Sequence, residues 1–253
     1  MRFDWSCVLP VVLSLAVVTA SASAQPIADR VLFVGNSFTY YNDSLHNHIG
    51  NLLKAAGLFR PEQTRLRALT LSGGRLQEQI AGIKAITTRD QRWQLVVLQG
   101  HSSAFSNSRN ARNMRTAART IAQHVRSQGS LPALFMTWGY KNEPEMIQAL
   151  QKGYTQLGEE INAVVLPVGL AFERVRRQHP EIELFSLDIE GFRTDAQGQL
   201  QPHYKQSVKH PNAAGTYLSA CVVFAVLTNQ SPLGLAYDAG LGHSHAKILQ
   251  QAA

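Results

Sequence analysis

Short apolar runs alternate along this chain with longer segments that have the apolar spacing of helices. The clearest runs span 31–34, 95–98 and 163–168, and a helical pattern follows each of them. Runs that no polar residue interrupts are typical of strands buried on both faces. Their alternation with helices, without a β-hairpin signal, predicts a parallel sheet covered on both faces. We therefore expect an α/β fold, a three-layer α/β/α sandwich with a central parallel sheet of about five strands.

The same patterns locate the expected elements. The expected strands span 31–34, 65–71, 95–98, 131–138 and 163–168, with a further short apolar run at 182–187. The expected helices span 44–56, 75–86, 107–126, 143–158, 168–178 and 211–226. Residues 188–209 are polar and show no helical spacing, so we expect an irregular insertion there.

The first 24 residues differ from the rest of the chain. Arg2 precedes an apolar stretch at 8–18, and small residues lead to an Ala-x-Ala site that ends at Ala24. This order is typical of a secretory signal peptide, and the apolar stretch is shorter than the roughly 20 residues that cross a bilayer. We expect cleavage after Ala24 and an exported single domain, residues 25–253, in the periplasm or outside the cell.

Composition excludes several other classes of protein. With 45% hydrophobic and 16% charged residues, the chain is typical of a globular protein. Cys7 and Cys221 are too few for a disulfide framework or a thiolate zinc site. Cys7 lies in the predicted signal peptide, and the apolar context of Cys221 predicts a small buried thiol.

The formal net charge is +7, and we interpret this excess chiefly as an aid to solubility. An acidic partner, such as a polyanionic polysaccharide or a lipid surface, is the alternative interpretation. No nucleic-acid-binding module is recognisable, and basic residues are not interleaved with aromatic ones. We therefore do not expect nucleic-acid binding, and after signal cleavage we expect no stable membrane insertion.

A serine follows the first predicted strand, in the segment Gly35-Asn36-Ser37-Phe38-Thr39. Ligands of open parallel sheets bind at the carboxyl ends of the strands. The amino end of a following helix also favours negative charge, so Ser37 is a candidate nucleophile. The alternative is a serine that only caps the turn.

A histidine with an unusual context precedes the last predicted helix. His210 stands before Pro211, which restricts its backbone to an extended conformation. A fixed imidazole suits general acid–base catalysis. His243 and His245 have no neighbouring carboxylate or cysteine in the sequence, so we expect them to be solvent-exposed and predict no metal site.

These segments together resemble the sequence blocks of the SGNH (GDSL-like) hydrolases. Residues 35–39 are similar to the block that carries the nucleophilic serine, and residues 210–218 to the block that carries the catalytic histidine. Residues 72–74 and 99–102 fall where the second and third blocks belong. The resemblance implies a flavodoxin-like SGNH hydrolase fold, with Ser37 as nucleophile and His210 as base. It implies ester hydrolysis through an acyl-enzyme, without cofactor or metal.

The acid partner of the histidine departs from the family pattern. The family places an aspartate three residues before its histidine, and Ser207 stands there in this chain. Asp188, which ends the apolar run 184–187, is our candidate acid. Asp195 and Glu190 are the alternatives, and a backbone carbonyl could also orient the ring.

The expected oxyanion hole departs from the pattern as well. The resemblance implies donors from the backbone N–H groups of Ser37 and Gly74, together with a side chain of the third block. His101 stands where the family has asparagine, and a neutral imidazole can donate a hydrogen bond too. Gln99 is the alternative donor if the register differs by two residues.

The resemblance also sets expectations about the substrate. The favoured one is an acyl or acetyl ester on a carbohydrate, and a lipid or lysophospholipid ester comes second. Transfer of the acyl group to a sugar would use the same residues as transfer to water. A non-catalytic binding module that keeps the fold is the alternative from another class.

Overall fold

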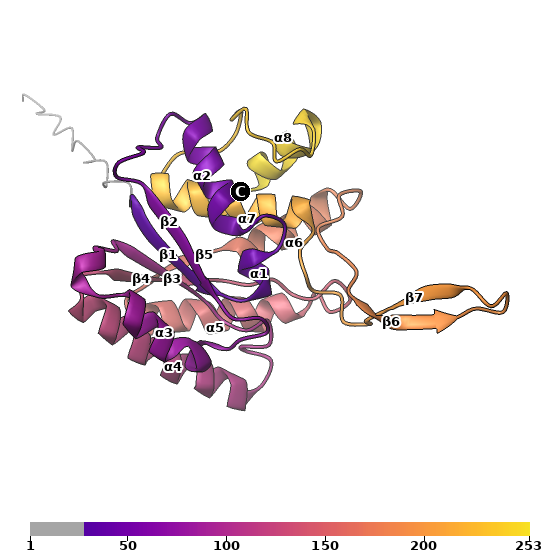
Figure 1. Cartoon of the computed structure of the whole chain (residues 1–253), viewed down its shortest axis with the longest axis horizontal. Coiled ribbons are helices and arrows are strands. Elements are labelled where there is room, and N and C mark those ends of the chain that lie inside the picture. The colour runs from indigo at the N-terminus through magenta and orange to yellow at the C-terminus, as the bar shows by residue number, and fades with distance from the viewer. Residues whose placement is uncertain (1–27) are drawn as a thin grey trace, which may run out of the picture.

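The computed structural model describes residues 28–253, and its centre is one parallel sheet (Figure 1). The predicted signal peptide lies outside the described residues. The sheet has the strand order β2-β1-β3-β4-β5. Its strands are β1 (Arg30–Gly35), β2 (Arg65–Thr70), β3 (Leu95–Gln99), β4 (Leu131–Phe135) and β5 (Val164–Leu166). The predicted parallel sheet of five strands is confirmed.

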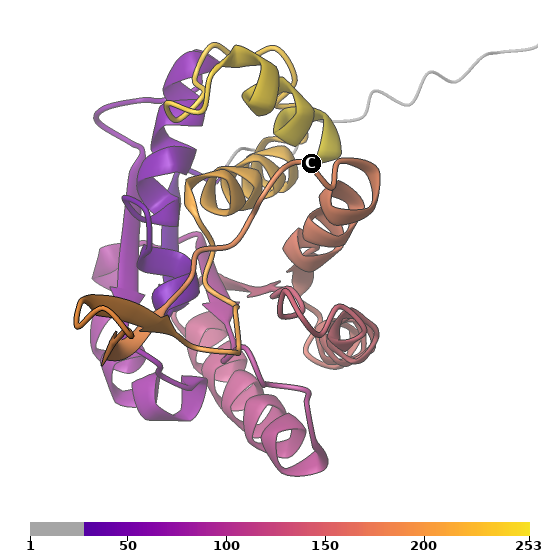
Figure 2. The ribbon, with the colours of Figure 1, turned by 90° about the vertical axis from the view of Figure 1, so that its right-hand side faces the viewer.

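Helices cover both faces of this sheet, as Figures 1 and 2 show. One face carries α2 (Leu45–Ala55), α6 (Val168–Gln178), α7 (Ala213–Thr228) and α8 (His243–Ala252). The other face carries α3 (Leu76–Ile86), α4 (Ser108–Ser127) and α5 (Met146–Glu160). None of these described helices is both long and apolar enough to cross a membrane.

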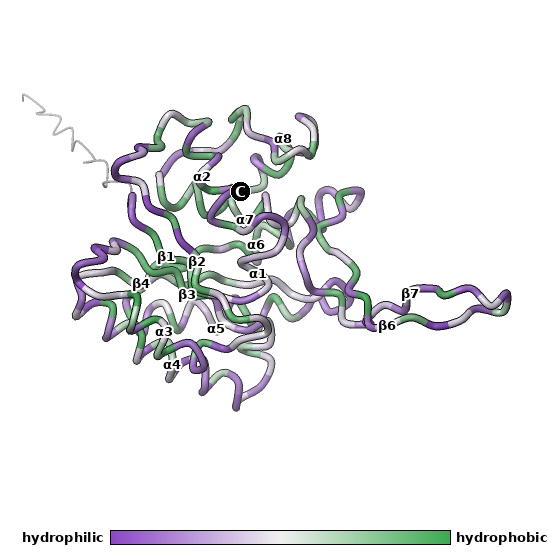
Figure 3. The backbone as a smooth tube through the Cα atoms, in the orientation of Figure 1, coloured by the Kyte–Doolittle hydropathy of each residue, from purple (hydrophilic) through white to green (hydrophobic). Residues whose placement is uncertain are grey.

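The apolar runs of the sequence are explained by two hydrophobic cores, one on each face of the sheet. In β1, Val31 and Phe33 belong to the core under α7, whereas Leu32 and Val34 belong to the core under α4. Successive side chains of a strand point to opposite faces, so a strand covered on both sides must be apolar at every position. Figure 3 shows the central strands as mainly hydrophobic, whereas the surface loops are mostly hydrophilic.

The helix α7 lies at the centre of its layer, in contact with α2, α6 and α8. Cys221 lies in this helix and is fully buried. Burial raises the pKa of its thiol to about 12, which keeps the sulfur protonated and unreactive at neutral pH. The prediction of a buried thiol is confirmed.

An antiparallel hairpin departs from the sequence prediction. Strands β6 (Ile189–Thr194) and β7 (Leu200–Tyr204) pair with each other and project away from the body of the molecule (Figure 1). The hairpin packs no face on either core, so it lacks the apolar pattern from which buried strands are predicted. The expectation of an irregular insertion was wrong.

Two other segments also differ from the prediction. The run 182–187 forms no strand and contributes only an isolated bridge between Phe185 and Pro211. The tail contains the helix α8, which was not predicted from the sequence. His243 and His245 lie on the exposed side of α8, as expected.

Candidate active site

The candidate nucleophile lies in a tight turn at the carboxyl end of β1. The chain passes from Gly35 through Asn36 into the short helix α1 (Ser37–Tyr40), and the Asn36 side chain accepts a hydrogen bond from the Phe38 N–H at 3.2 Å. A side chain at Gly35 would place Cβ only 2.2 Å from Thr39 Oγ1. The glycine therefore lets the turn close tightly enough to place Ser37 at the edge of the sheet.

Gln99, at the end of the neighbouring strand β3, stabilises this turn through its side chain. Its Oε1 atom accepts hydrogen bonds from the Asn36 N–H at 3.1 Å and from the Thr39 hydroxyl at 2.7 Å. Its amide nitrogen donates to Asn36 Oδ1 at 2.9 Å and to its neighbour Gly100, and the residue is only 1% exposed. The suggestion that Gln99 serves as an oxyanion donor was wrong, because its amide is already engaged in the turn.

Replacing Gln99 by leucine should therefore destabilise the protein. The change leaves the buried Asn36 N–H and Thr39 hydroxyl without their acceptor, and we expect the free energy of unfolding to fall by about 3 kcal/mol. Urea denaturation measures this difference. Gln151→Leu, on the exposed side of α5, is the matched control, with an expected change within about 0.5 kcal/mol. Equal stability of the two variants would contradict this role of Gln99.

The ring of His210 is fixed by its neighbours. The carbonyl of the preceding residue, Lys209, accepts a hydrogen bond from the Trp138 indole at 2.9 Å. The ring itself stacks on Tyr41, with centroids 4.5 Å apart, and meets Phe38 edge-on at 5.8 Å. An imidazole held in this way needs little reorganisation before it transfers a proton.

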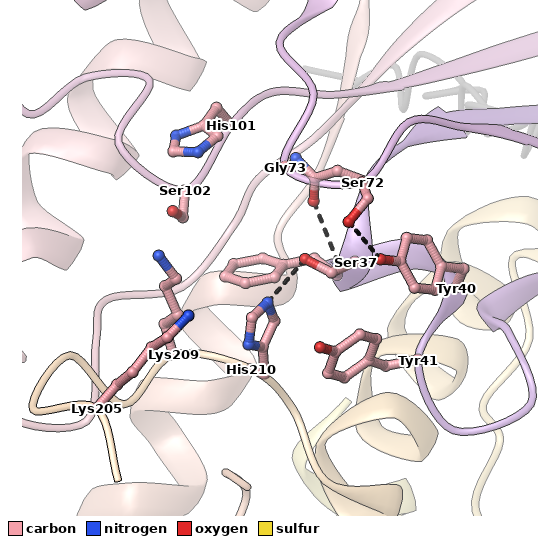
Figure 4. Close-up of a pocket in the computed structure, with 12 residues that line it drawn as sticks. Ser37, Tyr40, Tyr41, Ser72, Gly73, His101, Ser102, Lys205, Lys209 and His210 are labelled. Carbon is pink, nitrogen blue, oxygen red and sulfur yellow. Dashed lines mark hydrogen bonds between the residues drawn. The ribbon is translucent and has the colours of Figure 1, made fainter. Parts of the chain in front are cut away.

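Two side chains from other parts of the sequence meet at this histidine. Nε2 of His210 lies 2.8 Å from Ser37 Oγ, and Nδ1 lies 2.6 Å from Asp188 Oδ2. The carboxylate can only accept, so Nδ1 carries the proton and Nε2 accepts the hydrogen bond from the serine hydroxyl. Figure 4 shows the bond between Ser37 and His210 at the side of the pocket.

The structure separates Asp188 from the two alternative acids. Asp195 accepts hydrogen bonds from Gln197, Gln199 and Gln201 at the tip of the hairpin. Oε2 of Glu190 lies 3.2 Å from Nδ1 of His203. Of these three carboxylates, only Asp188 is hydrogen-bonded to His210.

The N–H of Gly74, the expected backbone donor of the second block, is engaged within its own turn. The Gly74 N–H donates to the Leu71 carbonyl at 2.8 Å, and the Gly74 carbonyl accepts from the Asn36 amide at 3.0 Å. Gly74 was therefore the wrong choice of oxyanion donor, because its N–H closes a turn. Gly73, at φ +63°, lines the pocket instead.

His101 lines the same pocket, across from Ser37 in Figure 4. Its Nδ1 accepts a hydrogen bond from the Ser103 N–H at 3.2 Å, so Nε2 carries the proton of the neutral ring. Burial lowers the pKa of His101, and the charges of Arg75 and Lys209 lower it further. At neutral pH the ring is therefore uncharged and can donate from Nε2.

Ser37, His210 and Asp188 are called the triad below. The pocket beside them has a volume of about 290 Å³. It lies at the carboxyl ends of β1 and β3, where ligands of parallel sheets bind. Its lining residues are Asn36, Ser37, Phe38, Tyr40, Tyr41, Ser72, Gly73, His101, Ser102, Lys205, Lys209 and His210. The tyrosines and lysines were not predicted from the sequence, although Tyr40, Tyr41 and Lys209 lie close in sequence to Ser37 or His210.

No protein-family model and no curated protein matches this sequence, but several solved structures share its fold. A DUF4886 family protein from Bacteroides uniformis is 16% identical, with a TM-score of 0.62 over 88% of this chain and 92% of that one. A proposed SGNH hydrolase from Slackia heliotrinireducens is 19% identical, with a TM-score of 0.58 over 80% and 100% of the two chains. An acetyl xylan esterase, AlAXEase, is 13% identical, with a TM-score of 0.57 over 78% and 98%. At these identities, the similarity establishes a common fold.

Proposed function

We propose that this chain, which has the fold of the SGNH hydrolases, is a serine esterase. The observation that carries the proposal is the pair of hydrogen bonds at His210, to Ser37 on one side and to Asp188 on the other. This is the geometry in which an imidazole activates a serine hydroxyl for attack on an ester carbonyl.

In the acylation step, Ser37 Oγ forms a bond to the carbonyl carbon while its proton moves to Nε2 of His210. Asp188 stabilises the imidazolium that results. The carbonyl oxygen becomes an oxyanion, and its donors in this proposal are the N–H groups of Ser37 and Gly73 and Nε2–H of His101. His210 then gives its proton to the alcohol as the carbon–oxygen bond of the ester breaks.

In the deacylation step, water takes the place of the alcohol. His210 accepts a proton from the water as its oxygen attacks the acyl carbon, and then returns a proton to Ser37 Oγ. The products are the free acid and the original serine. If a sugar hydroxyl entered instead of water, the same residues would transfer the acyl group.

For the substrate, we propose an acyl or acetyl ester on a carbohydrate outside the cytoplasm. The pocket volume of about 290 Å³ suits a small acyl group, and one structure with this fold is an acetyl xylan esterase. The predicted export signal supports an extracytoplasmic substrate. A lipid or lysophospholipid ester is the second candidate, and the assembled triad argues against a purely binding role.

A fluorophosphonate probe tests the proposal directly. Ser37 Oγ would bond to phosphorus, fluoride would leave, and His210 would accept the serine proton. We expect mass spectrometry to find the adduct on the peptide that contains Ser37, and to find none in Ser37→Ala. The surface variant Ser127→Ala should label like the wild type. An unlabelled wild type, or equal labelling of Ser37→Ala, would refute the proposal.

A further inference from the structure

Two lysines line the pocket beside the triad, and the mechanism above uses neither of them. The lining residues, all within the described part of the chain, include Lys205 and Lys209 but no carboxylate. Asp188, the neighbouring acid, is hydrogen-bonded to His210. Neither lysine forms an ion pair with any carboxylate in residues 28–253. The pocket therefore has an excess of positive charge.

The backbone places both lysines close to the reacting atoms. Lys205 directly follows β7, and its N–H donates to the Asp188 carbonyl at 2.9 Å. Lys209 directly precedes His210, and its carbonyl is held by the Trp138 indole. The main chain of Lys205 is thus hydrogen-bonded to Asp188. The main chain of Lys209 is covalently joined to His210 and held by Trp138.

The side chains of these lysines are turned toward the pocket. Nζ of Lys209 lies 5.4 Å from the centre of the Tyr140 ring, and the Tyr140 hydroxyl lies 2.9 Å from Ser102 Oγ, on the pocket wall. Figure 4 shows the ends of both lysines directed toward the space between Ser102 and His210. The cation–π contact orients the Lys209 ammonium without neutralising its charge.

The charge of Lys209 is also felt on the opposite wall of the pocket. Burial lowers the pKa of His101 there, and the charges of Arg75 and Lys209 lower it further, so the neutral ring adds no charge of its own. Cationic groups would be repelled from such a pocket, whereas an anionic group would gain charge-assisted hydrogen bonds. Attack of Ser37 on an uncharged ester uses neither lysine, which leaves both ammonium groups available to a charged part of the substrate.

We propose that Lys205 and Lys209 bind an anionic group on the alcohol part of the substrate. The substrate class is an acylated sugar that also carries a carboxylate or a phosphate, with the anion at the two lysines when the ester carbonyl lies at Ser37. This inference rests on the proposed esterase function and adds the charge of its substrate. Lys205 and Lys209 are then specificity-determining residues.

Equilibrium binding to the Ser37→Ala variant tests the inference without cleavage of the ester. The probes for calorimetry are mono-acetylated methyl glucoside, mono-acetylated methyl glucuronoside and a mono-acetylated glucose phosphate, which are neutral, carboxylate-bearing and phosphate-bearing. We expect at least one anionic probe to bind about tenfold more tightly than the neutral one. This preference should weaken as salt is added, because salt screens the lysine charges.

Variants of the lysines assign the preference to this pocket. In the Ser37→Ala background, Lys205→Gln with Lys209→Gln should remove the preference for the anion. The double variant Lys84→Gln with Lys152→Gln removes the same net charge from exposed surface positions and should keep it. Preference for the carboxylate alone indicates a uronic acid ester, and preference for the phosphate alone indicates a sugar phosphate ester.

Several outcomes would overturn the inference. They are equal binding of neutral and anionic probes, no binding of any probe, and a preference that survives loss of both lysines. The esterase proposal is tested separately, through hydrolysis of neutral 4-nitrophenyl acetate by the wild type and its loss in Ser37→Ala. An active wild type without a preference for anions refutes only the inference, whereas an inactive wild type refutes the function.

Discussion

Replacing Ser37 by alanine is expected to lower kcat for ester hydrolysis by at least about 10⁴-fold. The variant lacks the oxygen that forms the acyl-enzyme, and the remaining groups can only assist direct attack by water. Steady-state kinetics with 4-nitrophenyl acetate, corrected for spontaneous hydrolysis, measures the loss. Activity within tenfold of the wild type would contradict the assignment of the nucleophile.

The stability of Ser37→Ala provides the control for this result. The Ser37 hydroxyl contacts His210 in the pocket and belongs to neither hydrophobic core. We therefore expect the melting temperature to change by no more than a few degrees. A large fall in melting temperature would mean that the lost activity reflects unfolding and not the loss of the nucleophile.

Replacing Asp188 by asparagine is the change with the second largest expected effect, a fall of kcat by roughly 10⁴-fold. The asparagine amide can donate to Nδ1, which then favours the tautomer whose proton lies on Nε2 and blocks abstraction of the Ser37 proton. We expect KM to change little, because Asp188 does not line the pocket. Kinetics on saturating and limiting substrate separate the two parameters.

Asp195→Asn is the matched control for this variant. It makes the same chemical change at the tip of the hairpin, where the carboxylate accepts hydrogen bonds from residues of the hairpin itself. We expect its kcat to stay within about twofold of the wild type. Equal losses in the two variants, or full activity of Asp188→Asn, would remove Asp188 from the mechanism.

The sequence predicts most of this fold because burial on both faces leaves a strong signal. The run from Val31 to Val34 is apolar at each position, and the structure places successive side chains in opposite cores. The hairpin at 189–204 carries no such signal, because water covers most of it and Phe192 and Leu200 remain exposed. Its strands could be identified only from their mutual pairing.

Candidate site residues could be predicted from the sequence where they adjoin the end of a predicted element. They were harder to predict where their place in the pocket depends on the geometry of a turn. Ser37 and His210 adjoin the ends of predicted elements, and Asp188 ends an apolar run. Gly73 lines the pocket and Gly74 does not because the Gly74 N–H closes a turn with Leu71, and this turn leaves no pattern in the sequence. The same holds for Gln99, whose hydrogen bonds reach 60 residues or more along the chain.

The two ends of the hairpin are joined at its base, and this affects which changes of sequence the hairpin can accept. The hydrogen bond from the Lys205 N–H to the Asp188 carbonyl joins the two ends of the hairpin. We therefore expect that residues between these ends can be lengthened, shortened or exchanged while the Asp188 carboxylate and the His210 imidazole keep their separation. The hairpin is therefore a suitable place to insert new segments that recognise a ligand. It could also be shortened at its tip without altering any group that takes part in bond cleavage.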